Sequence, residues 1–289
     1  MMIYQTANEW QTAPHKRVAL FGMSGLGKTH VANTLRRDGH WFHYNVDYRI
    51  GTRYMGEFIV DNFKREAMKN VFLAELLRTD SIDISSNISF DNLAPLSTYL
   101  GKPGNPDLGG LAFEDYMHRQ SQHRIAEINA LSDTGYFINR AQTLYNYDNF
   151  ICDTGGSICE VVDPDNENDP VLRHLSDKLL LVWIKGSDAH AEQLIKRFNA
   201  APKPMYYPPE IMQDMWARYL VEKGKTEADV DPDEFIRWGY SEALQHRQPR
   251  YAAMADNWGV TVSAEDVAQI KTPDDFEAMI AQAITRKTR

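Results

Sequence analysis

Eight residues near the amino end, Gly22 to Thr29, follow the pattern G-x-x-x-x-G-K-T. The apolar run 18–21 precedes them, and a helical pattern begins at His30 and continues to Leu35. A strand, a glycine-rich loop and a helix in this order are the context in which the pattern forms a P-loop, which binds nucleoside triphosphates. The alternative is an ordinary glycine-rich turn that holds no ligand.

The chemistry expected of this loop follows from its residue types. Backbone N–H groups and the positive end of the helix dipole attract phosphate. Lys28 would reach the β- and γ-phosphates of ATP, where it is expected to be catalytic, and the Thr29 hydroxyl would bind Mg²⁺. The residues predicted to bind the nucleotide are Gly22, Ser24, Gly25, Leu26, Gly27, Lys28, Thr29 and His30.

Two carboxylates each follow an apolar run. Asp153 ends the run 149–153 and is expected to help hold Mg²⁺; the alternative is a residue that caps the next turn. Asp47 follows the run 41–46 and could orient or deprotonate a hydroxyl that attacks the γ-phosphate. The alternative for Asp47 is a helix N-cap.

Glycines and cations complete the set of candidates. Gly155 and Gly156 would let backbone N–H groups approach an acceptor substrate, unless they form an ordinary tight turn. Cations stabilise the charge that develops on a transferring phosphoryl group. Arg197, Lys203, Arg247 and Arg250 are candidates, and Lys203 lies in a proline-bounded loop that could act as a lid. The alternative for each is a solvated surface charge.

The elements that must position these residues alternate between strands and helices. Strands are expected at 18–21, 41–46, 149–153, 178–185 and 258–262, and helices at 57–78, 113–131, 137–145, 171–177, 188–199, 210–223, 232–246 and 274–288. This order predicts an α/β fold with a mostly parallel sheet flanked by helices, whose ligands bind at the carboxyl ends of the strands. Residues 79–111 are expected to be an irregular loop, a candidate for contact with a protein partner.

The composition of the chain disfavours several classes of function. The chain has 289 residues, is 43% hydrophobic and carries a net charge of −9, which disfavours binding to nucleic acid or to anionic membranes. No apolar run is long enough to span a membrane, and the amino end lacks the features of a signal peptide. Two cysteines, Cys152 and Cys159, are expected to be reduced thiols of a cytoplasmic protein.

The order of several weaker motifs resembles that of shikimate kinase and related small P-loop kinases. They are Asn45-Val46-Asp47, Arg124-Ile125-Ala126-Glu127, Gly155-Gly156-Ser157, Lys203-Pro204-Met205 and Arg247-Gln248-Pro249-Arg250-Tyr251. The resemblance implies a single P-loop kinase-like domain over 1–289 in which Asp47, Arg124, Gly155, Gly156 and Arg247 bind the acceptor and Lys203 belongs to a lid. The chain departs from the family by having Asn45 in place of an acid and by two insertions, at about 51–118 and 206–240, which make a different and larger acceptor plausible.

Three hypotheses follow. The leading one is an ATP- and Mg²⁺-dependent phosphotransferase that acts on a hydroxyl of a small, anionic metabolite. The second is an ATPase that drives a conformational switch or a partner interaction. The third is a nucleotide or nucleic-acid kinase, which the acidic net charge disfavours for long polyanions.

Overall fold

The computed structural model describes residues 2–288, and the chain divides into two compact units. The first unit comprises Met1–Val46, Ile128–Pro202 and Arg237–Arg289, and the second comprises Asp47–Glu127 and Lys203–Ile236. The insertions expected at 51–118 and 206–240 overlap the two segments of the second unit.

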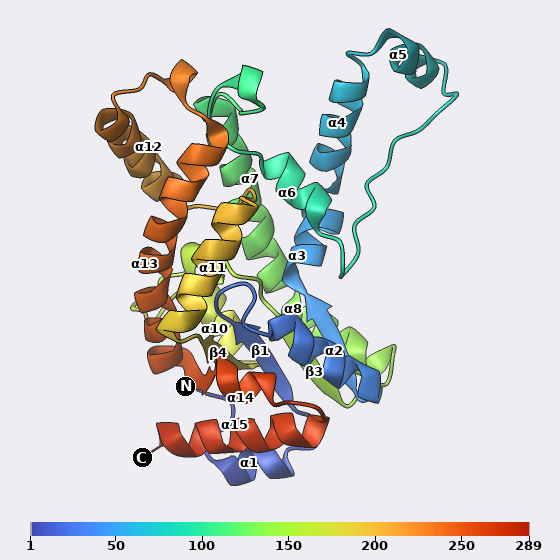
Figure 1. Ribbon diagram of the computed structural model, residues 1–289. Helices are drawn as coiled ribbons and strands as arrows, with labels where there is room; N and C mark the ends of the chain where they lie inside the picture. The colour runs from blue at the N-terminus through green and yellow to red at the C-terminus, as the bar shows by residue number, and fades with distance from the viewer. Residues whose placement is uncertain (1, 289) are drawn as a thin grey trace. The chain divides into compact units, whose positions relative to one another are not determined.

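The first unit contains a sheet and the helices that flank it (Figure 1). Its elements are α1 (Ala7–Thr12), β1 (Arg17–Phe21), α2 (Lys28–Asp38), β2 (Trp41–Asn45), α8 (Thr134–Thr143), β3 (Asn149–Asp153), α9 (Ile158–Val161), α10 (Pro170–Ser176), β4 (Leu180–Lys185), α11 (Asp188–Ala200), β5 (Gly259–Ser263), α14 (Ala264–Ala268) and α15 (Pro273–Lys287).

All five strands run parallel, in the order β2-β3-β1-β4-β5. The central strands β1, β3 and β4 are almost entirely buried, which explains why they read as continuous apolar runs. The register pairs Leu20 of β1 and Asn45 of β2 with Asp153 of β3, so the carboxyl ends of these strands lie at one edge. The predicted α/β class with a parallel sheet flanked by helices is confirmed.

The side chains of β2 point alternately to the two faces of the sheet, and helices cover both faces. Phe42 and Tyr44 contact Phe137 of α8, whereas Trp41 packs edge-on against Phe276 of α15 at 5.7 Å between ring centroids. Successive side chains of a strand point to opposite faces, so α8 and α15 cover different sides. Figure 1 shows α1 beside α15, and the indole of Trp10 in α1 donates to the backbone oxygen of Glu277 at 2.9 Å.

The second unit is built from helices and irregular segments. Its elements are η1 (Ile50–Tyr54), α4 (Gly56–Ala67), α5 (Val71–Arg78), α6 (Ala94–Leu100), η2 (Pro106–Leu108), α12 (Pro209–Lys223) and η3 (Glu227–Asp229). Three further helices, α3 (Val46–Arg49), α7 (Phe113–Ser132) and α13 (Pro232–Trp258), have residues in both units.

Three expectations about the helices are wrong. The helix expected at 57–78 is two helices, because the Asn70 side chain accepts from the N–H of Leu73 and starts α5 afresh. The segment 79–111 is not a continuous loop, since α6 and η2 lie within it and α6 buries Leu96, Tyr99 and Leu100. Finally, α13 does not end at 246 but continues through Pro249 to Trp258.

Candidate functional site

The loop of residues 22–29 connects β1 to α2 and depends on its glycines. Gly22, Gly25 and Gly27 all have positive φ, at 130°, 87° and 100°. A Cβ at Gly22 would lie 2.7 Å from the backbone oxygen of Ile184, and a Cβ at Gly27 would lie 2.7 Å from Val267 Cγ1. Strand β4 and helix α14 therefore approach this loop too closely for any other residue type.

The Lys28 side chain folds back over the same loop. Its Nζ donates to the backbone oxygens of Gly22 at 2.7 Å and Met23 at 3.0 Å, and the residue is only 6% exposed. The ammonium group is thus held beside the loop by carbonyl groups that a stronger acceptor, such as a phosphate oxygen, could replace.

The first turn of α2 lies at the end of the loop. Gly27 occupies the N-cap position, so this helix begins without a capping hydrogen bond from a side chain. The first N–H groups of a helix have no partner within the helix itself and carry its positive dipole end. The uncapped start of this 11-residue helix is therefore a favourable place for an anion.

Thr29 in this turn lies beside the predicted metal-binding carboxylate. Its hydroxyl donates to Asp153 Oδ2 at 3.3 Å, and the N–H of Gly155 donates to Asp153 Oδ1 at 3.2 Å. Asp153 is 5% exposed at the carboxyl end of β3. Two oxygen ligands at hydrogen-bonding distance fit a hard cation such as Mg²⁺, which takes a few protein oxygens and completes its shell with water and phosphate. No group of three or more His, Cys, Asp or Glu suited to a metal occurs in residues 2–288.

The glycine turn after β3 also lies against the loop. Gly155 has φ 77°, and a Cβ at Gly156 would lie 3.7 Å from the Ser24 nitrogen and 3.8 Å from the Gly22 oxygen. The structure therefore brings together the loop 22–29, Asp153 and the Gly155–Gly156 turn, as the sequence predicted. The roles assigned to these residues stay predictions.

A buried histidine lies next to this cluster on β2. Burial lowers the pKa of His43 from 6.5 to about 4; the charge of Asp153 opposes this shift, and Arg36 adds to it. His43 is therefore a neutral imidazole at neutral pH. It contributes no positive charge beside Asp153 and does not compete with a cation for that carboxylate.

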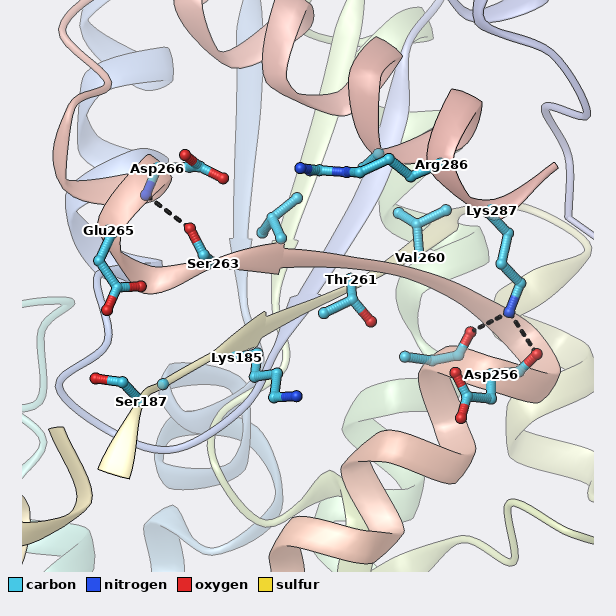
Figure 2. Close-up of a pocket in the computed structure, with 14 residues that line it drawn as sticks. Lys185, Ser187, Asp256, Val260, Thr261, Ser263, Glu265, Asp266, Arg286 and Lys287 are labelled. Carbon is cyan, nitrogen blue, oxygen red and sulfur yellow. Dashed lines mark hydrogen bonds between the residues drawn. The ribbon is translucent and has the colours of Figure 1, made fainter. Parts of the chain in front are cut away.

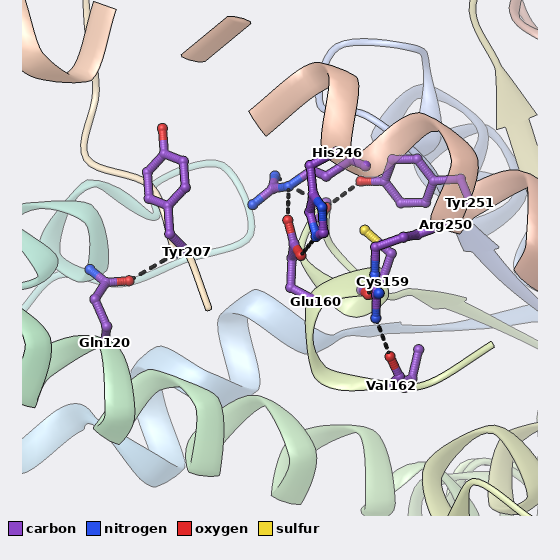
Figure 3. Close-up of polar contacts among 10 residues, drawn as sticks. Gln120, Cys159, Glu160, Val162, Tyr207, His246, Arg250 and Tyr251 are labelled. Atoms are coloured by element: carbon purple, nitrogen blue, oxygen red, sulfur yellow. Dashed lines mark hydrogen bonds and ion pairs between the residues drawn. The ribbon is translucent and has the colours of Figure 1, made fainter. Parts of the chain in front are cut away.

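Arg247, which contacts the glycine turn, forms a buried ion pair with Glu160, labelled in Figure 3. Its Nε donates to Glu160 Oε1 at 2.7 Å, and its Nη1 donates to the backbone oxygen of Gly156 at 3.4 Å. His246 Nε2 lies 3.0 Å from Glu160 Oε2, and the Tyr251 hydroxyl donates to the same Gly156 oxygen. Burial alone would lower the pKa of Arg247, but the Glu160 carboxylate outweighs it and raises the pKa.

The partners of Arg247 in the structure differ from the acceptor substrate that the sequence predicts for it. The sequence predicts that Arg247 binds the acceptor, but its guanidinium is already paired with a carboxylate and bound to the glycine turn. Glu160, the residue responsible, had no distinguishing signal in the sequence, because a single Glu after a Gly-Ser turn reads as a surface residue. Arg250 is also engaged: it donates to the backbone oxygens of Cys159 at 2.7 Å and Val162 at 2.6 Å.

Arg197 of α11 is a cation that the structure places beside the loop. A Cβ at Gly25 would lie 3.3 Å from Arg197 Nη1 and 3.2 Å from Leu194 Cδ2. His30, another predicted nucleotide contact, has its ring Nε2 3.0 Å from the backbone oxygen of Ile270. His30 is therefore bound to the loop after α14, while Arg197 is in position to contact an anion at Gly25.

The remaining predicted residues belong to the second unit. Asp47 is half-buried in the first turn of α3, Arg124 is half-buried on α7, and Lys203 is exposed in the segment before α12. Their roles as acceptor ligands and lid residue stay predictions.

Around Arg124, helix α7 carries a cluster of buried polar side chains. The rings of His123 and Tyr206 stack at 4.8 Å between centroids, and His123 Nδ1 lies 3.6 Å from Glu127 Oε2. Gln120 is fully buried, and its Oε1 accepts from the N–H of Tyr207 at 3.0 Å (Figure 3). Such buried polar groups tie the segment 203–208 to α7.

Comparison with known proteins gives no family assignment. No protein-family model matches the sequence, and no curated protein is significantly similar to it. Within residues 2–288, no helix is both long and apolar enough to cross a lipid bilayer.

Proposed function

We propose that the loop 22–29 is a P-loop and that the protein is an ATP- and Mg²⁺-dependent phosphotransferase with a hydroxyl acceptor. The observation that carries the proposal is the Thr29–Asp153 contact at the uncapped start of α2, with the Lys28 ammonium beside it. A phosphate-binding helix end, a lysine and two oxygen ligands together are the parts that phosphoryl transfer requires. The sheet order is compatible with a P-loop NTPase fold.

In this proposal each residue has one task. Lys28 leaves the carbonyl groups of Gly22 and Met23 and pairs with the β- and γ-phosphates. Thr29 and Asp153 hold Mg²⁺, which neutralises phosphate charge when it is bound. Arg197 adds positive charge beside Gly25. Asp47 orients or deprotonates the acceptor hydroxyl, as the resemblance to shikimate kinase implies.

The acceptor is proposed to be a small, anionic metabolite bound by Arg124 and by the Gly155–Gly156 turn, as the same resemblance implies. Because Glu160 already neutralises Arg247, we assign Arg247 to holding the glycine turn through the Gly156 oxygen. In this proposal, Arg124 rather than Arg247 binds the negative charge of the acceptor.

A specific observation favours a second candidate, an ATPase that acts on a protein partner. In the second unit, Val71 is 85% exposed and Phe72 is 67% exposed, and both lie at the start of α5. Neighbouring apolar side chains of this size on a surface often mark a protein interface. In this alternative, hydrolysis would change the affinity for the partner, and no small acceptor would be phosphorylated.

Calorimetry with Mg-ATP tests the nucleotide site. Wild-type protein is expected to bind, and Lys28→Ala is expected to weaken binding at least tenfold, because it removes a charge-assisted contact worth about 1.5–3 kcal/mol. Lys271→Ala, at an exposed lysine outside the loop, is the matched control. Absence of any heat of binding with the wild-type protein would refute the proposal.

The reaction is then followed by ADP release with and without fractionated metabolites. Stimulation by a small-molecule fraction supports the phosphotransferase. Hydrolysis that no fraction stimulates supports the ATPase, and stimulation only by nucleic acid supports the third hypothesis.

A further inference from the structure

Outside the site described above, a pocket of about 510 Å³ follows strand β5 (Figure 2). Lys287 in this pocket already donates to the backbone oxygens of Ala255 at 3.1 Å and Asp256 at 2.6 Å. The charged side chains that line the pocket are all exposed and are equally divided between acids and bases. They are Lys185, Asp256, Glu265, Asp266, Arg286 and Lys287. Such a lining favours no particular charge on a ligand.

Helix α7 in the second unit presents buried hydrogen-bond donors instead. Residues four apart in a helix lie on the same face, so Tyr116, Gln120 and Arg124 form one row. Tyr116 and Gln120 are buried, and Arg124 is half-buried. Burial raises the pKa of Tyr116 well above its usual value, and the nearby phenols of Tyr207 and Tyr206 raise it further. The side chains of two tyrosines from another segment thus lie close to this row.

The amide group of Gln120 has a partner at one end only. Its Oε1 accepts from the N–H of Tyr207 at 3.0 Å, which assigns the orientation of the amide (Figure 3). Its Nε2 is therefore a donor, and within residues 2–288 it has no hydrogen-bond partner. Gln120 is 0% exposed, so bulk solvent does not satisfy this donor. A buried donor without a protein acceptor indicates a bound water or a ligand.

Arg124, one helical turn further along, has no protein partner either. In the part of the chain that the structure describes, its guanidinium makes no ion pair or hydrogen bond. A guanidinium is a planar fork of N–H donors that matches an oxyanion such as a carboxylate or a phosphate. The row on α7 therefore has two sets of donors without protein acceptors, one charged and one neutral.

We infer that Gln120 determines specificity in the acceptor site by donating from its Nε2 to an uncharged oxygen or ring nitrogen of the acceptor. This inference rests on the proposed phosphotransferase function and extends it. Arg124 binds the oxyanion of the acceptor, and Gln120 binds a second group beside that oxyanion. Because Tyr207 already occupies Oε1, an amino group at this place in the acceptor would meet only donors and would be rejected.

The segment 203–208 lies against the same row, so the acceptor enters when this segment moves. The backbone N–H of Tyr207 is bonded to Gln120, and the Tyr206 ring stacks on the ring of His123 at 4.8 Å between centroids. A segment that closes over a bound substrate excludes water from the reaction. The contact between Tyr207 and Gln120 therefore joins closure of the segment to the residue that binds the acceptor.

ADP release in the presence of small-molecule fractions from an anion-exchange column tests the inference. The wild-type protein is expected to be stimulated by a fraction that the column retains, because the acceptor is an anion. Gln120→Met removes the donor without changing the charge. It is expected to raise the amount of that fraction needed for half-maximal stimulation at least about tenfold. Gln213→Met, at an exposed glutamine of α12, is the matched control and is expected to respond like the wild type.

A second variant, Gln120→Glu, separates direct contact with the acceptor from an effect through Tyr207. An ionised glutamate keeps an oxygen for the N–H of Tyr207 but has no donor in place of Nε2. Contact with the acceptor is therefore lost in both variants, and both are expected to need more of the fraction. Urea unfolding checks that each variant is folded.

Three results would overturn the inference. A wild-type response of Gln120→Met would show that a buried water satisfies Nε2. A loss in Gln120→Met but not in Gln120→Glu would assign the effect to the contact with Tyr207. Stimulation only by compounds that the column does not retain would remove the oxyanion.

Failure of the proposed function gives a different result. If no fraction stimulates a wild-type protein that binds Mg-ATP in the calorimeter, the phosphotransferase is refuted, and the inference with it. If a fraction stimulates the wild type and both Gln120 variants equally, only the inference is refuted.

Discussion

Substitution of Glu160 by glutamine tests its buried ion pair with Arg247. Glutamine keeps nearly the same shape but removes the negative charge that faces Arg247. The guanidinium of this residue, which is 4% exposed, would keep the Gly156 oxygen as an acceptor at 3.4 Å but lose its counterion. His246 would lose the carboxylate that lies 3.0 Å from its Nε2. A buried charge without its counterion is the costliest outcome of such a change.

The magnitude follows from the burial of both partners. Glu160 is 5% exposed and Arg247 is 4% exposed, and they meet at 2.7 Å, so solvent screening is weak. Breaking a pair of this kind is expected to lower the free energy of unfolding by about 3–5 kcal/mol. The double variant Glu160→Gln/Arg247→Met leaves no buried charge, and we expect it to recover at least half of that loss.

Urea unfolding followed by circular dichroism measures the free energy of unfolding of the wild-type protein, of the two single variants and of the double variant, which together form a double-mutant cycle. Asp214→Asn is the matched control, because its partner Arg218 lies at a similar distance, 2.9 Å, but both side chains are exposed. The control is expected to leave the midpoint unchanged. A loss below about 1 kcal/mol for Glu160→Gln, or a double variant less stable than either single variant, would refute the reasoning.

Three further predictions concern the buried cysteines, the glycines around the loop 22–29 and the proposed catalytic carboxylate. Burial raises the pKa of Cys152 and raises the pKa of Cys159 to about 12. Neither thiol should therefore react with a disulfide reagent at about pH 8 until urea unfolds the protein. Rapid reaction in native buffer would contradict this. Gly22→Ala should lower the urea midpoint markedly, because its Cβ would lie 2.7 Å from a backbone oxygen of β4. Gly156→Ala should fold normally, because the nearest atom to its Cβ, the Ser24 nitrogen, is 3.7 Å away. Equal midpoints for the two variants would count against the close approach of β4 to Gly22. Asp47→Asn should keep Mg-ATP affinity but lower turnover at least about 100-fold, and near-normal turnover would remove Asp47 from the mechanism.

The sheet was largely predictable because strands buried on both faces have continuous apolar runs. The run at 149–153 is β3, and the run at 178–185 contains all of β4 and the two residues before it. The meeting of the loop 22–29 with Asp153 was also predictable, since the carboxyl ends of parallel strands lie at one edge. These conclusions needed only local patterns and a general rule of topology.

Other features depend on contacts between distant residues, which a single sequence does not reveal. Pro249 normally ends a helix, because it lacks an N–H and clashes with the preceding turn. Helix α13 nevertheless continues, with Arg247, Arg250 and Tyr251 all bound to backbone oxygens between Gly156 and Val162. The resemblance to the kinase family assigned Arg247 to the acceptor. Nothing near Arg247 in the sequence indicates that it pairs with Glu160, which is 87 residues away.

The order of the strands has a consequence for the chain as it leaves the ribosome. Strands β1 and β2 are made first, but they are not neighbours, and each must wait for β3, which lies between them. Roughly 100 residues separate β2 from β3. At a synthesis rate of about 5–20 residues per second, β1 and β2 therefore remain without a pairing strand for about 5–20 seconds. The nascent polypeptide is thus expected to engage a chaperone such as a ribosome-associated holdase during that interval, and a stall placed just before residue 149 should lengthen the association.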